Sequence, residues 1–213
     1  MKISVQSSSH RRSWKQRRGC EMRHLLLAMT LIAGAGTADA QMSATPVRKH
    51  DSTMTLSSPD IADGGIIPDK HTANAAPLPA TSPALSWTGT PAGTQSFVLI
   101  MHDLDVMAGK SPVDNLHWMM FNIPGTVTSL PPGIPTNIPV LPDGTVQLRR
   151  GNTQNYGYGG PGAPAPIYHH YIFELWALDT KIALSETSTR DDVMNAMEGH
   201  ILDKGVLMAR FHR

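Results

Sequence analysis

Three segments of the chain carry side chains that could bind an anion or move a proton. Asp103 and Asp105 follow one apolar run, His117 opens a second, and His169 and Tyr171 open a third. Histidine can become cationic near neutral pH, and a carboxylate on its other ring nitrogen fixes the tautomer. We therefore expect one aspartate to orient a histidine, while the two histidines hold a phosphate or a carboxylate.

A glycine-rich segment, Tyr156 to Pro161, follows the second of these runs. Its residues Gly159, Gly160 and Pro161 could complete the same site, because glycine permits positive φ and lets backbone N–H groups approach a ligand. A tight turn is the simpler interpretation of such a segment taken alone. Its occurrence together with the histidines favours a ligand-binding role.

The candidate residues lie at the ends of predicted strands. Residues 96–101, 116–123 and 168–178 are rich in β-favouring apolar side chains, typical of strands buried on both faces. A strand end places its side chains at the rim of a rigid scaffold, where several strands can line one pocket. Six prolines between Pro124 and Pro142 predict a long surface loop.

The helical part of the chain is predicted near its C-terminal end. Thr189 can cap a helix whose first turn contains Asp191 and Asp192. A second short helix over 200–204 is expected to lead through Gly205 into a last strand over 206–211. Strands first and helices last indicate a mostly β fold with short C-terminal helices.

The N-terminal 40 residues have the features of a cleaved signal peptide. A basic stretch precedes the apolar run from Leu25 to Ile32, and Ala38-Asp39-Ala40 matches the small-residue pattern of a cleavage site. We predict cleavage after Ala40, with a true start that could be Met22, and periplasmic localisation. The apolar run is shorter than the roughly 20 residues of a spanning helix, so a retained anchor is the less favoured interpretation. Residues 41–52 are predicted to be a flexible lead-in to one domain over 53–213.

Removing residues 1–40 changes the charge balance. They contain seven of the 18 Lys and Arg residues and two of the 17 Asp and Glu residues, which leaves 11 basic and 15 acidic residues. The remaining chain is mildly acidic and has no basic footprint for nucleic acid. Cys20 is the only cysteine and lies in the removed part, so neither a disulfide nor thiol chemistry is expected.

The order of these segments resembles the phosphatidylethanolamine-binding protein family, in particular its bacterial Raf-kinase-inhibitor-like branch. The resemblance extends from about residue 53 to residue 213. It rests on these segments: Ser57-Ser58-Pro59-Asp60, Ser82 to Trp87, Asp103-Leu104-Asp105, Leu116-His117-Trp118, Asn122-Ile123-Pro124, Gly159-Gly160-Pro161, His169 to Phe173 and Ala177-Leu178-Asp179.

The resemblance implies an antiparallel β-sandwich with a surface pocket for a phospholipid head group or a similar anion. By motif position, the pocket residues would be Asp103, Asp105, His117, His169 and Tyr171, next to the turn of Gly159, Gly160 and Pro161. The chain departs from the family pattern where Leu104 replaces a proline, Gly162 a common cysteine and His170 an arginine.

A binding protein without a cofactor is the favoured function, and three others stay open. A hydrolase would have to use activated water, because the sequence contains no G-x-S-x-G or Walker-type loop. A metal site from His102, His117, His169 and an aspartate lacks a closely spaced ligand pair. Inhibition of an envelope protease or binding of another protein is the third. Peripheral membrane contact and a homodimer are further expectations.

Overall fold

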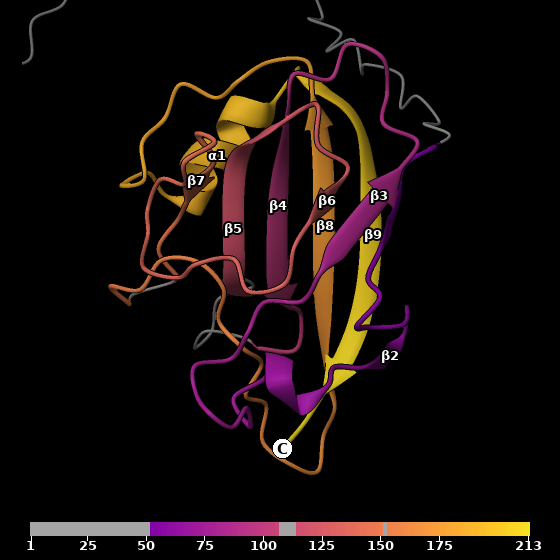
Figure 1. The fold of residues 1–213 in the computed structure, drawn as a ribbon, viewed down its shortest axis with the longest axis vertical. Coiled ribbons are helices and arrows are strands. Elements are labelled where there is room, and N and C mark those ends of the chain that lie inside the picture. Colours follow the sequence, from indigo (N-terminus) through magenta and orange to yellow (C-terminus); the bar gives the residue numbers. More distant parts are fainter. Residues whose placement is uncertain (1–51, 107–113, 151–152) are drawn as a thin grey trace, which may run out of the picture. The chain divides into compact units, whose positions relative to one another are not determined.

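Strands dominate the structure, a computed structural model that describes residues 52–106, 114–150 and 153–213 (Figure 1). The predicted signal peptide and all but the last residue of the lead-in lie outside the described residues. A six-stranded sheet has the order β2-β9-β8-β4-β5-β7. Its strands are β2 (Gly65–Ile66), β4 (Ser96–Asp103), β5 (Asn115–Pro124), β7 (Val146–Gln147), β8 (His169–Leu178) and β9 (Ile201–Phe211). All pairs are antiparallel except β2 with β9, which is parallel.

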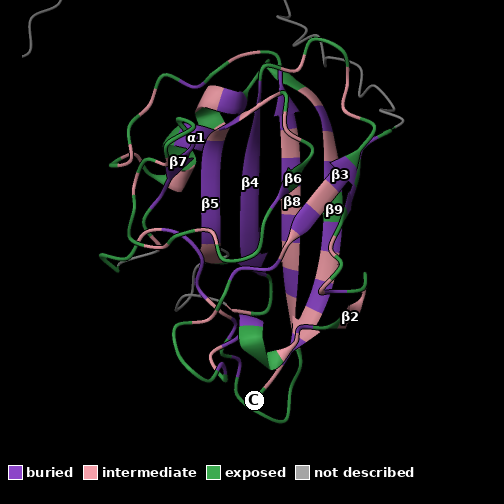
Figure 2. Ribbon diagram, viewed as in Figure 1, coloured by how far each residue is buried: buried purple, intermediate pink, exposed green. Residues whose placement is uncertain are grey.

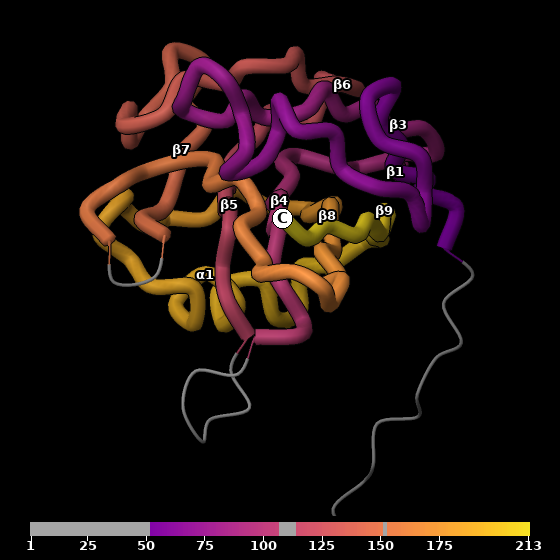
Figure 3. The backbone as a smooth tube through the Cα atoms, turned by 90° about the horizontal axis from the view of Figure 1, so that it is seen from below, coloured from indigo at the N-terminus to yellow at the C-terminus, as the bar shows by residue number. Residues whose placement is uncertain are grey.

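A second sheet of three short strands packs on one face of the large sheet (Figure 3). It consists of β1 (Thr55–Ser57), β3 (Leu85–Thr88) and β6 (Ser129–Leu130), in the order β1-β3-β6. Helix α1 (Arg190–Met197) covers part of the other face of the large sheet, beside β4 and β5. A 3-10 turn, η1 (Asp69–His71), precedes β3.

Alternating side chains of β4 build the core on both faces of the large sheet. Phe97, Leu99 and Met101 pack with the small sheet, whereas Val98 and Ile100 pack with α1. Every residue of β4 is buried, as Figure 2 shows. The prediction of a mostly β fold is therefore confirmed. The expectation of burial on both faces holds for β4 and fails for β8, in which alternate residues are only half-buried.

The helix begins where the sequence predicts. The Thr189 side chain accepts a hydrogen bond from the backbone N–H of Asp192, whose carboxylate accepts one from the backbone N–H of Thr189. This capping box satisfies two N–H groups that a helix start would otherwise leave unpaired. No helix among the described residues is long and apolar enough to cross a membrane.

The predicted second helix over 200–204 is wrong. Residues 201–204 are the first part of β9 and pair with the end of β8. The buried Asp203 accepts hydrogen bonds from the backbone N–H groups of Thr53 and Met54, which ties β9 to the residues just before β1. These partners lie about 150 residues away, so local sequence could not reveal them.

The proline-rich segment over 124–142 is attached to the rest of the fold at several points. It contains β6, which pairs with β3, and the backbone N–H of Ile134 donates to the Ser82 hydroxyl. The buried Gln147 side chain donates to the carbonyl oxygens of Pro135 and Ile138. The segment thus replaces missing ladder bonds with bonds to side chains.

Candidate functional site

Asp103 and His169 meet at one end of the large sheet. Asp103 is the last residue of β4 and His169 the first of β8, and antiparallel pairing brings these ends together. The Nδ1 atom of His169 lies 2.8 Å from Oδ2 of Asp103, whose side chain is 2% exposed. Because the carboxylate can only accept, Nδ1 carries the proton, and Nε2 is left to interact with other groups.

Asp105 makes a second, more exposed pair with His170. Its carboxylate accepts hydrogen bonds from the backbone N–H and the ring Nδ1 of His170. Partial burial would raise the pKa of Asp105, but these bonds outweigh it and lower the pKa. The backbone N–H of Asp105 in turn donates to Oδ1 of Asp103. Both carboxylates are thus held by neighbouring donors.

His117 enters the site through a β-bulge in β5. Met101 pairs with Trp118 and His102 with Leu116, which leaves His117 as an extra residue between them. The ring of His117 lies edge-on to that of Tyr171, with 5.2 Å between the ring centroids. Strict alternation would place the His117 side chain on the opposite face of the sheet from Trp118. The bulge turns it to the same face as Trp118 and Tyr171.

The His117 ring is held in one tautomer. Its Nδ1 donates to the carbonyl oxygen of Gly159 over 2.8 Å, and its Nε2 accepts from the Asn115 side-chain amide over 3.0 Å. Burial lowers the pKa of His117, although Gly159 and Asp103 oppose the shift. The neutral ring therefore presents an acceptor at Nε2.

Tyr171 supplies a buried hydroxyl beside Asp103. Burial raises the pKa of Tyr171, and the nearby Asp103 carboxylate adds to the effect, so the hydroxyl stays protonated. Its neighbours also include the backbone of Gly162 and Ala163. Within the described ranges the hydroxyl makes no hydrogen bond of good geometry, although the Asp103 carboxylate lies within reach of its proton.

The glycine turn packs against its neighbours rather than adopting positive φ at Gly159 and Gly160. A Cβ atom on Gly159 would overlap the guanidinium of Arg150, and one on Gly160 would lie 2.7 Å from Cβ of Ala80. The N–H of Gly159 already donates to the backbone oxygen of His117, so it is not a free donor for a ligand. The carbonyl oxygen of Pro161 accepts from the N–H of Ala73.

Arg150 lies beside this turn, although sequence reasoning did not single it out. Its Nε atom is buried and has no hydrogen-bond partner among the residues the structure describes. The preceding Arg149 is exposed and donates to the Tyr156 hydroxyl. The buried Leu148 offers a signal, because a period-two alternation would turn Arg149 outward and Arg150 inward.

A pocket of about 440 Å³ opens next to Arg150. One wall is the segment 73–80, and the other is Arg150 with the turn from Tyr158 to Gly160. A larger hollow of about 580 Å³ lies over the small sheet, but serine hydroxyls and apolar groups line it, and no charged residue does. The pocket at the glycine turn adjoins the site through Gly159, which lines it and whose carbonyl oxygen bonds to the His117 ring.

The sequence of the domain matches one family model. That model describes the phosphatidylethanolamine-binding protein and aligns with residues 57–212. The chain belongs to the phosphatidylethanolamine-binding protein family.

Relatives of this family member come from archaea and bacteria. It is 38% identical to a UPF0098 protein of Methanothermobacter thermautotrophicus over 160 residues, which cover 75% of this chain and 99% of the relative. It is 37% identical to the UPF0098 protein YbhB of Escherichia coli over 130 residues, or 59% of this chain and 78% of the relative.

A solved structure of the family has the same fold. The crystal structure of Escherichia coli YbcL, described as a new member of the mammalian PEBP family, aligns with a TM-score of 0.61 at 29% identity. The alignment covers 75% of this chain and 98% of YbcL.

His102 lies apart from the site formed by Asp103, His117, His169 and Tyr171. It faces the opposite side of β4 from Asp103, where its Nδ1 bonds to Asp114 and its Nε2 lies 3.6 Å from Glu174. A metal centre of His102, His117 and His169 is therefore not formed. Within the described part of the chain, no group of three or more histidine, cysteine or acidic residues is arranged to hold a metal ion.

Proposed function

We propose that this phosphatidylethanolamine-binding protein family member binds a small anion, such as phosphate or a phospholipid head group, between His117, His169 and Tyr171. The buried Tyr171 hydroxyl carries the proposal, because it is a protonated donor whose contact with the Asp103 carboxylate lacks good hydrogen-bond geometry. A buried donor left unpaired costs about 1–3 kcal/mol, which an anion in contact with it would recover.

The two histidines support different contacts with such a ligand. Asp103 holds Nδ1 of His169, so that a proton on Nε2 would complete a chain from Asp103 through the ring to the anion. The neutral His117 ring has an acceptor at Nε2 that the Asn115 amide occupies, so the O–H of hydrogen phosphate or the ammonium of an ethanolamine head group would bind there in place of Asn115. The site thus favours ligands that both accept and donate.

The acidic residues do not argue against an anion. Asp103 is bonded to His169 and to the backbone N–H of Asp105, and Asp105 is bonded to His170. Their charges are therefore directed toward ring and backbone donors rather than toward a ligand. Gly159 contributes its carbonyl oxygen to the orientation of His117 and no N–H to the ligand.

The proposal is tested by titrating the protein with phosphate, phosphoethanolamine and acetate while following the histidine ring signals by NMR. We expect saturable shifts at His117 and His169 that disappear in the double variant His117→Ala/His169→Ala. His200→Ala is the matched control, because His200 also pairs with an aspartate, Asp179, over 2.8 Å, outside this site. Absence of shifts with all three ligands would overturn the anion pocket and favour a protein partner.

A hydrolase is the second candidate, and the Asp103–His169 pair favours it. A histidine whose Nδ1 is held by a carboxylate can accept a proton from water at Nε2, as general-base hydrolysis of an ester requires. Release of p-nitrophenol from p-nitrophenyl phosphate or acetate measures this activity. Turnover that is lost in His169→Ala and kept in His200→Ala would establish catalysis.

Export to the periplasm is part of the proposed function. Residues 1–40 support it by their basic stretch, apolar run and Ala38-Asp39-Ala40 pattern. N-terminal sequencing of the protein recovered from a periplasmic extract should begin at Gln41. A protein that keeps residues 22–40 would contradict cleavage after Ala40.

A further inference from the structure

We propose that the pocket beside Arg150 is a second binding site, which takes a compact organic anion with its charged group on Arg150 and its apolar part on the segment 73–80. The site lies next to the proposed His117–His169 site, with the Gly159–Gly160 turn between Arg150 and the His117 ring. It does not depend on the histidines, none of which lines the pocket.

The charge of the Arg150 guanidinium is unpaired among the residues that the structure describes. No ion pair of Arg150 is found in the described part of the chain, and its buried Nε atom has no acceptor there. By contrast, Arg190 pairs with Asp114, and Nε of Arg210 donates to the carbonyl oxygen of Gly64. A buried guanidinium N–H without an acceptor is costly, so this arrangement favours an anionic ligand.

The Arg150 guanidinium has room in the pocket wall only because residue 159 is glycine. The Arg150 side chain occupies the space in which any larger residue at 159 would place its Cβ atom. Burial lowers the pKa of Arg150, yet a guanidinium stays protonated at physiological pH. Its planar N–H groups can bind a carboxylate or a phosphate in bidentate fashion.

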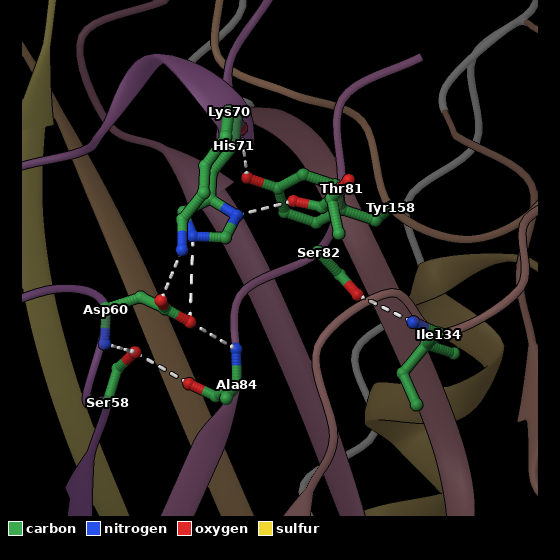
Figure 4. Close-up of polar contacts among 9 residues, drawn as sticks. All are labelled: Ser58, Asp60, Lys70, His71, Thr81, Ser82, Ala84, Ile134 and Tyr158. Atoms are coloured by element: carbon green, nitrogen blue, oxygen red, sulfur yellow. Dashed lines mark hydrogen bonds and ion pairs between the residues drawn. The ribbon is translucent and has the colours of Figure 1, made fainter. Parts of the chain in front are cut away.

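The opposite wall of the pocket is held in place by a polar network (Figure 4). At one end of the segment 73–80, the Tyr158 hydroxyl donates to the backbone oxygen of His71 over 2.6 Å. At the other end, Nδ1 of His71 donates to the carbonyl oxygen of Thr81 over 2.6 Å. Asp60 links the residues before the segment to those after it. Its carboxylate pairs with Lys70 and accepts a hydrogen bond from the backbone N–H of Ala84. The wall is therefore built before a ligand arrives.

The lining defines the rest of the ligand. Ala73, Leu78, Pro79 and Ala80 give the wall an apolar surface, and no acidic residue lines the pocket. A volume of about 440 Å³ is in the ordinary range for small-molecule sites. Leu78 is 66% exposed, so an apolar group on the ligand would cover surface that now contacts water. A short-chain carboxylate or an alkyl phosphate has both required parts.

The experiment titrates the full protein with inorganic phosphate, butyl phosphate and butyrate, and follows the Nε–H signal of Arg150 by ¹H–¹⁵N NMR. We expect butyl phosphate and butyrate to shift this signal saturably. Arg150→Gln should weaken binding of both by at least about tenfold, whereas Arg149→Gln, which changes the neighbouring exposed arginine, should not. Arg150→Lys should also weaken binding, since it keeps the charge and loses the planar fork.

Two further variants separate this site from its alternatives. Leu78→Ser should weaken binding of butyl phosphate and leave binding of inorganic phosphate unchanged. His117→Ala/His169→Ala should leave the shift of the Arg150 signal intact, so failure of the histidine site would not remove it. An equal loss of affinity in Arg149→Gln and Arg150→Gln would show nonspecific attraction and overturn the proposal, as would an Arg150 signal that no probe shifts.

Discussion

The Oδ2 atom of Asp103 lies 2.8 Å from Nδ1 of His169, although 66 residues separate them in the chain. The pair forms because β4 ends where the antiparallel β8 begins, and both side chains turn toward the face covered by the small sheet. A carboxylate in this position fixes the tautomer and the orientation of the ring. The consequence is measurable in ligand affinity.

Asp103→Asn should weaken phosphate binding by about tenfold, because a neutral amide accepts the Nδ1 hydrogen bond less strongly than a carboxylate and orients the ring less firmly. Isothermal titration calorimetry measures the change. Asp179→Asn is the control, since it alters an exposed His–Asp pair outside the site. Unchanged affinity in Asp103→Asn would remove the orienting role of this carboxylate.

His102 should make the stability of the domain depend on pH above neutrality. Burial would lower the pKa of His102, but Glu174 and Asp114 outweigh burial and raise it. A raised pKa in the folded state stabilises the fold fully below the unfolded value of about 6.5, and this contribution is lost as the pH rises through the folded value. His102→Gln should therefore cost about 1–3 kcal/mol at pH 5.5 and less at pH 8.5.

Urea denaturation of both proteins at several pH values measures this difference. His200→Gln, which removes an exposed histidine, should show no comparable dependence. A cost that stays constant from pH 5.5 to pH 8.5 would mean that His102 acts through packing alone.

Asp203 should stabilise the domain most strongly above about pH 4. Burial would raise the pKa of Asp203, but hydrogen bonds from Ser52 and from the backbone N–H groups of Thr53, Lys204 and Met54 lower it. A lowered pKa adds stability above the unfolded value of about 3.8, and the contribution is lost as the pH falls through the folded value. Asp203→Asn should lower the free energy of unfolding at pH 7 by about 1–3 kcal/mol. A difference from wild type that persists unchanged at pH 2 would contradict this explanation.

Gly160 should tolerate no side chain. A Cβ atom there would lie 2.7 Å from Cβ of Ala80 and 2.8 Å from the backbone of Thr72, so Gly160→Ala should cost about 1–3 kcal/mol of stability. Gly162→Ala is the control, because its Cβ would meet Ala73 at an ordinary 3.5 Å. Thermal unfolding compares the two. Equal melting temperatures would show that the segment 73–80 moves away freely.

Local sequence determined the central strands, the helix start and the placement of several site residues. Uninterrupted apolar runs become strands when both faces are covered, and this predicted β4, β5 and β8 to within a few residues. The side chains of Thr189 and Asp192 each accept a hydrogen bond from the other residue's backbone N–H, so the start of α1 needs no distant partner. Asp103 and His169 could be assigned to a rim because they lie at strand ends.

Only the tertiary structure decided which of these groups meet. The bulge that turns His117 toward Tyr171 depends on the register between β4 and β5, which the sequence of β5 does not contain. Residues 201–204 become strand because β8 and the residues just before β1 form hydrogen bonds with them. Arg150 lies in a pocket because a segment some 70 residues earlier forms the opposite wall. Each outcome depends on long-range contacts, which local propensity and periodicity cannot encode.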